Sequence, residues 1–293
     1  MHEDETRIGA SLVRRLLAEQ FPRWARLPLR RVRSAGTVNA LYRLGDDLAV
    51  RLPRIADGAD DAVKEHTWLP RLAPALPFAV PEILGLGTPA AHYPWHWSVV
   101  RWLDGDPPAP GALTCAQQLA ADLGAFVTAL RGTTLPGGPA SYRGTPLAAV
   151  DAETRSAIDD LRGAIDTGAA TAAWEEALAT PAWTGPPRWL HADLMPMNLL
   201  IREGRLAAVL DFGTLGTGDP ACDFIPAWNL LPASARPAFR DAAGADDAGW
   251  ARGRGWALSM ALVQLPYYRD TNPVIAANAE HVIREVLAEQ RAV

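Results

Sequence analysis

The first third of the chain alternates short apolar runs with turn residues, a pattern typical of β-strands. Residues 38–44 and 48–52 flank a tight turn at 45–47, as the two strands of a hairpin do. A third run covers residues 97–103 and closes on the turn-rich segment 104–108. We therefore predict a small, mostly antiparallel sheet before residue 104.

After residue 104, apolar residues recur mainly at three- and four-residue spacing, which indicates amphipathic helices. The first of these helices is expected to start at Thr114, whose hydroxyl suits a helix cap, and to bury Leu119 and Leu123. The other predicted helices carry these residues or stretches: Ile158, Leu161 and Ile165; Trp174 and Leu178; 256–265; and 274–287. The sequence thus predicts a larger, mostly helical second part.

One hairpin is predicted within this helical part. Apolar runs at 199–201 and 206–210 flank a glycine-containing turn at 203–204. Asp193 and Asn198 precede the hairpin and Asp211 follows it. Because a hairpin folds both of its ends back together, we expect these three polar side chains to converge.

These three side chains have the chemistry that phosphoryl transfer needs. A carboxylate at Asp193 can orient a hydroxyl nucleophile, while Asn198 and Asp211 offer hard oxygen ligands that suit Mg²⁺. Two other interpretations fit parts of the pattern: a hairpin with ordinary polar turn residues, and a metal-dependent hydrolase with a His-x-Asp motif. The spacing, the order and the hydrophobic pattern together disfavour both.

A longer series of motifs surrounds these residues. In order they are His-Ala-Asp at 191–193, Asn198, Asp-Phe-Gly at 211–213 and Gly-Asp-Pro-Ala-Cys-Asp at 218–223. This series resembles the aminoglycoside phosphotransferase family, whose members have a protein-kinase-like fold. Ala192 replaces the glycine of the family pattern, a mild change unless the position needs a positive φ.

The resemblance implies an α+β, bilobal, protein-kinase-like fold. A small, mostly antiparallel β-sheet lobe over residues 1–103 is expected to bind the nucleotide. A larger, mostly helical lobe over residues 104–293 is expected to carry catalysis and substrate binding.

The resemblance also implies roles for the motif residues. Asp193 is expected to be the catalytic base or to orient the acceptor hydroxyl, and Asn198 and Asp211 to hold Mg²⁺ against the phosphates of ATP or GTP. Three further residues are expected to hold the catalytic loop in shape: His191, Asp219 and Asp223.

Five positions of the first lobe are assigned to nucleotide binding by the same resemblance: Gly36, Arg51, Glu65, Arg101 and Leu103. Gly36 lies in the loop expected over the phosphates, but it is the only glycine of that loop and is equally consistent with an ordinary turn. Arg101 and Leu103 lie at the predicted hinge between the lobes, where backbone groups are expected to bind the nucleobase. Backbone recognition leaves the choice between ATP and GTP open.

Arg51 stands on the predicted strand where a phosphate-binding lysine is expected, and its planar, permanently charged guanidinium also suits phosphate oxygens. Glu65, fourteen residues later, is the carboxylate expected to pair with it. The simpler alternatives are a solvated strand arginine and a surface glutamate. Lys64 is the only lysine of the chain, but it lies in a helix predicted to begin at residues 60–61.

The composition is that of an ordinary globular protein, with 49% hydrophobic and 21% charged residues. No apolar run is long enough to span a membrane, and the start at residues 1–5 is acidic, so we expect no membrane partner and a cytoplasmic location. Two cysteines do not suggest a disulfide framework, and a net charge of −5 argues against a nucleic-acid partner. A monomer or homodimer is expected.

Three functions remain open at this point. The first is phosphorylation of a hydroxyl group on an aminoglycoside or a related antibiotic, and the second is a small-metabolite kinase acting on a sugar, an amino alcohol or a nucleoside. The third, a catalytically silent nucleotide-binding regulator, is motivated by Arg51 but disfavoured by the intact catalytic set. Residues available for the small-molecule hydroxyl acceptor lie in the last part of the chain: Trp256, Tyr267, Tyr268, Asp270, Glu280 and Glu285.

Overall fold

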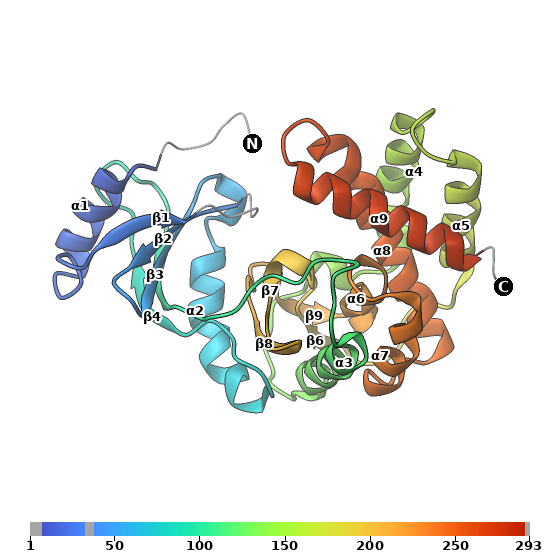
Figure 1. The fold of residues 1–293 in the computed structure, drawn as a ribbon, viewed down its shortest axis with the longest axis horizontal. Coiled ribbons are helices and arrows are strands. Elements are labelled where there is room, and N and C mark those ends of the chain that lie inside the picture. Colours follow the sequence, from blue (N-terminus) through green and yellow to red (C-terminus); the bar gives the residue numbers. More distant parts are fainter. Residues whose placement is uncertain (1–7, 33–37, 291–293) are drawn as a thin grey trace.

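The protein is represented by a computed structural model, which describes residues 8–32 and 38–290. A five-stranded antiparallel sheet and helix α1 (Ala10–Gln20) form the N-terminal part (Figure 1). The strands lie in the order β1 (Leu29–Val32), β2 (Asn39–Leu44), β3 (Leu48–Pro53), β5 (Trp97–Arg101) and β4 (Ile83–Gly87). The predicted small antiparallel sheet is therefore confirmed.

Alternating burial along β2 builds the first hydrophobic core. Ala40, Tyr42 and Leu44 are buried, and the residues between them are partly exposed. This is the period of a strand with one face on a core. Helix α1 contributes Leu16 and Leu17 to the same core.

Helix α2 (Asp61–Leu72) stands between the sheet and the helical part (Figure 1). It begins at the predicted aspartates, with Asp60 at the cap position. Leu69 and Leu72, near its end, belong to the core of the C-terminal part and not to that of the sheet. Helix α2, which also contacts β4 of the sheet, is therefore anchored in the core of the C-terminal part.

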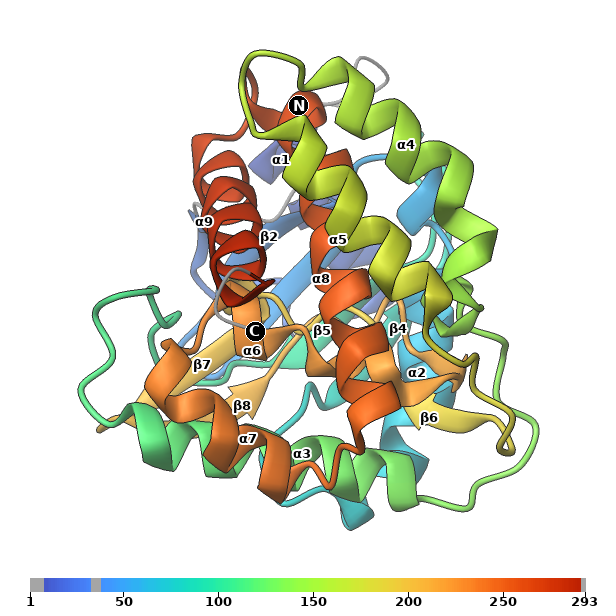
Figure 2. The same ribbon diagram turned by 90° about the vertical axis from the view of Figure 1, so that its right-hand side faces the viewer.

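The C-terminal part is mostly helical. Its helices are α3 (Ala116–Gly132), α4 (Asp151–Asp160), α5 (Thr167–Ala179), α6 (Pro226–Asn229), α7 (Arg236–Ala242), α8 (Asp247–Tyr268) and α9 (Pro273–Gln290). Two short antiparallel pairs join them: β6 (Arg188–Leu190) with β9 (Gly216–Gly218), and β7 (Leu199–Arg202) with β8 (Arg205–Val209). Helix α8 runs through the centre, packed against α4, α5 and α9, and α3 lies beside α7 (Figure 2).

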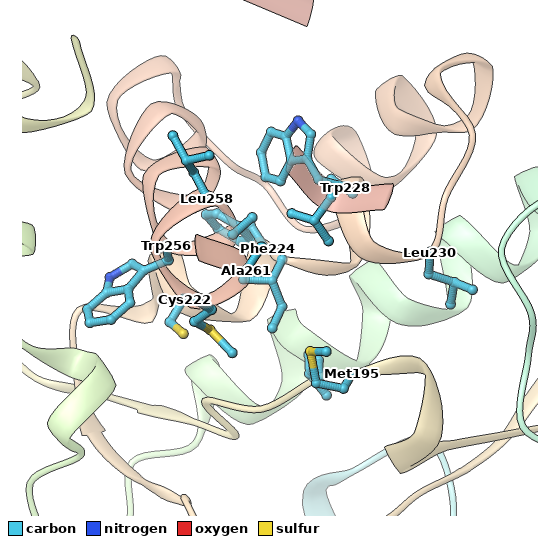
Figure 3. Packing of buried hydrophobic residues seen from close by; sticks show 14 of the residues in the cluster. Met195, Cys222, Phe224, Trp228, Leu230, Trp256, Leu258 and Ala261 are labelled. Carbon is cyan, nitrogen blue, oxygen red and sulfur yellow. The ribbon is translucent and has the colours of Figure 1, made fainter. Parts of the chain in front are cut away.

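Buried aromatic and aliphatic side chains hold residues 191–198 against helix α8; we call these residues the catalytic segment because they include the predicted site residues Asp193 and Asn198. Figure 3 shows Phe224 and Trp228, which follow β9, close to Leu258 and Ala261 of α8, with Met195 of the catalytic segment beside them. All five residues are buried in one cluster. The catalytic segment is thus positioned by a rigid core.

Two predicted helix boundaries are wrong. Helix α3 starts at Ala116 with Cys115 at the cap position and has no side-chain cap, so Thr114 is not the cap residue. Helix α4 ends at Asp160, because Gly163 adopts a left-handed φ of 82° that breaks the helix, and Ile165 lies in the following loop. Among the described residues, no helix has the length and apolar character needed to cross a membrane.

Candidate active site

The β7–β8 hairpin positions Asp193, Asn198 and Asp211 at one of its ends. The backbone N–H of Leu210 donates to the carbonyl of Asn198 at 2.7 Å, which places Asn198 next to Asp211. The Asn198 side-chain amide donates to the carbonyl and to the carboxylate Oδ2 of Asp193, at 2.9 and 2.8 Å. The structure thus brings together the three residues that the sequence analysis assigned to catalysis and metal binding.

Arg143 is a further residue of this site that the sequence analysis missed. Its Nη1 donates to Oδ1 of Asp193 at 2.6 Å and to the carbonyl of Ala192 at 2.7 Å. Both carboxylate oxygens of Asp193 therefore have a partner, one in Arg143 and the other in Asn198. Arg143 lies in a short turn fifty residues before Asp193, and no spacing in the sequence links the two.

Asp223 holds the backbone of the catalytic loop. Its carboxylate accepts hydrogen bonds from the backbone N–H groups of His191 and Ala192, at 2.8 and 2.7 Å. It is fully buried, and burial raises its pKa to about 7, although the two backbone donors oppose that shift. These contacts are of the kind expected for a residue that supports the loop.

His191 ties the loop to the end of the hairpin. Its Nδ1 accepts from the backbone N–H of Asp193 at 3.2 Å, and its Nε2 lies 2.9 Å from the carbonyl of Leu210. An acceptor at Nδ1 and a carbonyl at Nε2 require a neutral imidazole protonated on Nε2. Burial lowers the pKa of His191 in agreement with that neutral form. The side chain acts here as a structural link.

The pKa of Asp223 leads to a testable pH dependence. A carboxyl whose pKa is higher in the folded than in the unfolded protein stabilises the fold below the unfolded pKa of about 3.9, and this contribution is lost as the pH rises through about 7. Between about pH 4 and 7, the free energy of unfolding should therefore fall more steeply in the unmodified protein than in Asp223→Asn. Urea denaturation at several pH values measures both slopes; equal slopes would contradict the assignment.

Ala192 adopts a left-handed backbone conformation, with a φ of 68°, and is completely buried. The Cβ atom makes this region costly for residues other than glycine, at about 1–2 kcal/mol. The family's glycine at this position is thus explained by the φ value, and the alanine of this chain is strained.

Ala192→Gly is expected to stabilise the protein by about 0.5–1 kcal/mol, because glycine adopts this φ without strain but gains freedom in the unfolded chain. Chemical denaturation measures the difference. Ala208, buried in strand β8, provides the matched control: Ala208→Gly should destabilise by a similar amount. Loss of stability in both variants would show that Ala192 is not strained.

Asp219 lies behind the catalytic loop. It accepts from the backbone N–H of Ala221 at 3.0 Å and from Nε of Arg252 at 2.7 Å. Both charged side chains are buried, so removal of either one would leave the other as an uncompensated buried charge. The pair joins the segment after β9 to helix α8, which is a supporting role. Arg252 was not singled out in the sequence.

Arg51 is held by two carboxylates at the sheet side of the site. Its Nη1 lies 2.6 Å from Glu65 of α2, and its Nη2 lies 3.3 Å from Asp211. Burial alone would lower the pKa of Arg51, but Glu65 and Asp211 raise it. Glu65 also accepts from the backbone N–H of Phe212 at 2.9 Å. The predicted Arg51–Glu65 ion pair is present and connects the sheet, α2 and the Asp-Phe-Gly turn.

Lys64 does not lie with Arg51. Its ammonium group contacts the carbonyl of Gly213 and lies 3.6 Å from the carboxylate of Asp61. Lys64 therefore fastens helix α2 to the turn after Asp211.

A cleft of about 1020 Å³ runs between the sheet and the helical part, large enough for a nucleotide and a second small molecule. Arg51, Asp193, Asn198 and Asp211 line it. Arg101 and Leu103 line it at the end of β5, although the Arg101 side chain turns to Glu82 at 2.5 Å. Gly36 lies outside the described residues. The remaining predicted residues support the walls and do not line the cleft: Glu65, His191, Asp219 and Asp223.

The donor set fits magnesium in the mode used with nucleotides. Asn198 keeps its carbonyl oxygen for a ligand because its amide nitrogen donates to Asp193, and Asp211 offers a carboxylate. In the described part of the chain, this site included, no group of three or more His, Cys, Asp or Glu side chains could hold a metal ion. Mg²⁺ bound by one or two protein oxygens plus phosphate oxygens needs no such group.

The residues considered for the acceptor mostly lie elsewhere. Of that set, Tyr268 lines the cleft. Trp256 is buried in the core, and Glu285 pairs with Arg236. The sequence does not show which face of a helix lies toward the cleft. The residues that bind the acceptor could therefore not be assigned from the sequence.

Comparison with known proteins agrees with this geometry. The model of the phosphotransferase enzyme family matches residues 30–256. No curated protein sequence matches the chain.

Similar solved structures share the fold. The complex of APH(2″)-IIia with GDP and kanamycin is 19% identical, with a TM-score of 0.76 over 94% of this chain and 98% of that one. The GDP complex of aminoglycoside 2′-phosphotransferase-IIIa is 18% identical, with a TM-score of 0.77 over 97% and 100%. The apoenzyme of a macrolide 2′-phosphotransferase from Brachybacterium faecium is 22% identical, with a TM-score of 0.61 over 93% and 97%. The α+β, kinase-like fold class is thereby confirmed.

Proposed function

The chain belongs to the phosphotransferase enzyme family, and we propose that it transfers the γ-phosphoryl group of ATP or GTP to a hydroxyl group of a small molecule. The observation that carries this proposal is the set Asp193, Asn198 and Asp211, gathered at one end of the β7–β8 hairpin and exposed to one cleft. Residues 1–103 would bind the nucleotide and residues 104–293 the acceptor. The donor nucleotide suits a cytoplasmic location.

In this function, Asp193 orients the acceptor hydroxyl and accepts its proton as the oxygen attacks the γ-phosphorus. Arg51, fixed in direction by Glu65, neutralises charge on the phosphates of the donor. Ala49, Val100 and Leu200 are apolar residues that line the same cleft, and the nucleobase would pack against them.

Asn198 and Asp211 would hold Mg²⁺, which when bound neutralises phosphate charge in the transition state. His191 and Asp223 keep Asp193 in place through the backbone of the loop. Positioning and charge neutralisation of this kind supply most of the catalysis in phosphoryl transfer.

An antibiotic of the aminoglycoside or macrolide type is the acceptor class supported by the similar structures, one of which contains kanamycin and another of which is a macrolide 2′-phosphotransferase. Purified protein with Mg²⁺ and ATP or GTP is to be tested against both classes and against sugars, amino alcohols and nucleosides. Release of nucleoside diphosphate and the mass of the product identify the acceptor.

Acceptor-dependent diphosphate release with a phosphorylated antibiotic is the expected result. Phosphorylation of a metabolite instead would assign a small-metabolite kinase. Nucleotide binding without transfer to any compound would indicate a catalytically silent regulator and overturn the proposal.

A further inference from the structure

The wall of the cleft opposite the sheet is built from helices α8 and α9. Gln264 and Tyr268 line the cleft from α8, and Ile275, Asn278 and His281 line it from α9 at helical spacing. Tyr142, Met195 and Met197 line the cleft as well, together with Arg143. The side chains available to an acceptor here are therefore mainly apolar or uncharged.

Carboxylates are scarce on this wall. Among the described residues that line the cleft, Asp193 and Asp211 are the only acids, and both belong to the phosphoryl-transfer site. Two glutamates of α9, Glu285 and Glu289, do not line the cleft and pair with Arg236. These two acids are therefore turned away from the cleft and already engaged.

The charges that do line the wall are positive. Arg143 forms an ion pair with Asp193 at 2.6 Å, so the charge of Arg143 is compensated by that carboxylate. Arg284 is 67% exposed and lies 3.9 Å from Glu280, a weak and solvated pair. A ligand lying along α9 would therefore meet a positive charge.

Two polar atoms of α9 are suited to a hydroxyl group. Oδ1 of Asn278 and Nε2 of His281 are buried, and neither has a hydrogen-bond partner among the described residues. Buried polar groups normally have a partner in the protein, in water or in a ligand. Burial lowers the pKa of His281, so the imidazole is neutral at pH 7 and adds no charge.

A polycation and an apolar compound are expected to bind this wall with different free energies. Ammonium groups that leave water without a carboxylate partner lose hydration free energy, and they are also repelled by Arg284. An apolar body gains free energy by burying its surface on Met197 and on Val274, which lines the cleft from α9 and is 56% exposed.

We propose that the acceptor is a bulky hydroxyl compound with a large apolar surface and at most one positive charge, and not a polycation. This inference rests on the phosphoryl transfer proposed above and narrows its substrate class. Hydroxyl groups of such a compound meet Asn278 and His281 while one hydroxyl reaches Asp193.

The first test compares kcat/KM for two probes in the presence of Mg²⁺ and ATP or GTP. One probe is a macrolide with a single amino group, and the other is kanamycin, whose several amino groups are protonated at neutral pH. We expect the macrolide to be preferred by at least about tenfold, since one uncompensated charge contact costs on the order of 1 kcal/mol or more. Product mass confirms the transfer.

The second test changes the charge of the wall. Arg284→Glu should raise kcat/KM for kanamycin by about fivefold, an effect of the size expected for an exposed charge pair, and should not raise it for the macrolide. Arg162→Glu is the matched control, because Arg162 is 75% exposed beyond the end of α4 and does not line the cleft. Arg162→Glu should change kcat/KM neither for kanamycin nor for the macrolide.

The outcomes separate the inference from the proposed function. Kanamycin phosphorylated as well as or better than the macrolide would overturn the inference and leave the proposed function standing. An Arg284→Glu variant with unchanged kanamycin kinetics would also overturn it. Transfer to neither class nor to any other hydroxyl compound would overturn the proposed function and the inference with it.

Discussion

Asp193→Ala is expected to lower kcat for phosphoryl transfer by about 10²–10⁴-fold, the range found when a general base is removed. Nucleotide affinity should stay nearly unchanged, because the Asn198 amide keeps its hydrogen bond to the backbone carbonyl of residue 193, and Arg51 is held by Glu65 and Asp211. Steady-state kinetics with the acceptor found in the panel measures kcat, and calorimetry measures nucleotide binding.

The matched control is Asp241→Ala, since Asp241 is an exposed aspartate of helix α7 that does not line the cleft. It should keep full activity. Because Asp193→Ala leaves the part-buried Arg143 without its carboxylate, circular dichroism must show that the variant is folded. If Asp193→Ala is not folded, Asp193→Asn, which keeps the shape of the side chain, takes its place. Full transfer by either folded variant would remove Asp193 from the catalytic role.

The catalytic hairpin could be predicted because its signals are local. Two apolar runs around a turn define the strands, and strand pairing alone brings residues 198 and 211 together. The Arg51–Glu65 pair could be predicted by resemblance, because a strand and the following helix hold a fixed spacing between the two. Local periodicity was sufficient for the hairpin, whereas the ion pair needed the family resemblance.

The residues that escaped prediction act across long sequence separations. Arg143 reaches Asp193 because the turn at residues 142–144 packs against β9 and the segment that follows it. Arg252 reaches Asp219 because α8 packs against that same segment. Tertiary packing sets both contacts, and no sequence spacing reports it. The strain at Ala192 was likewise hidden, since the backbone angle of a single alanine depends on the loop around it.

The same limit applied to the acceptor wall. The sequence offers charged and aromatic residues of the last helices for a cationic or sugar-like acceptor. The structure shows Glu285 paired with Arg236, while uncharged Asn278 lines the cleft. Charge in a helical sequence therefore says little about a binding site until the orientation of the helix is known.

Asp211→Asn is expected to lower the affinity for Mg²⁺-bound nucleotide and the rate of transfer, each by about 10²-fold or more, because a metal ion supplies several kcal/mol of charge stabilisation in such sites. Asparagine is the suitable replacement, since Asp211 has a φ of 57° and asparagine tolerates the left-handed region better than alanine does. Arg51 keeps its partner Glu65 in this variant.

Calorimetry with ATP and GTP, each with and without Mg²⁺, isolates the role of the metal. In the unmodified protein, and in the control Asp241→Asn, Mg²⁺ should strengthen nucleotide binding. In Asp211→Asn, binding without Mg²⁺ should be preserved or slightly stronger, since one negative charge near the phosphates is gone, and most of the gain from Mg²⁺ should disappear. If the variant retained that gain, Asp211 would not be a metal ligand, and its contact with Arg51 would be its main role.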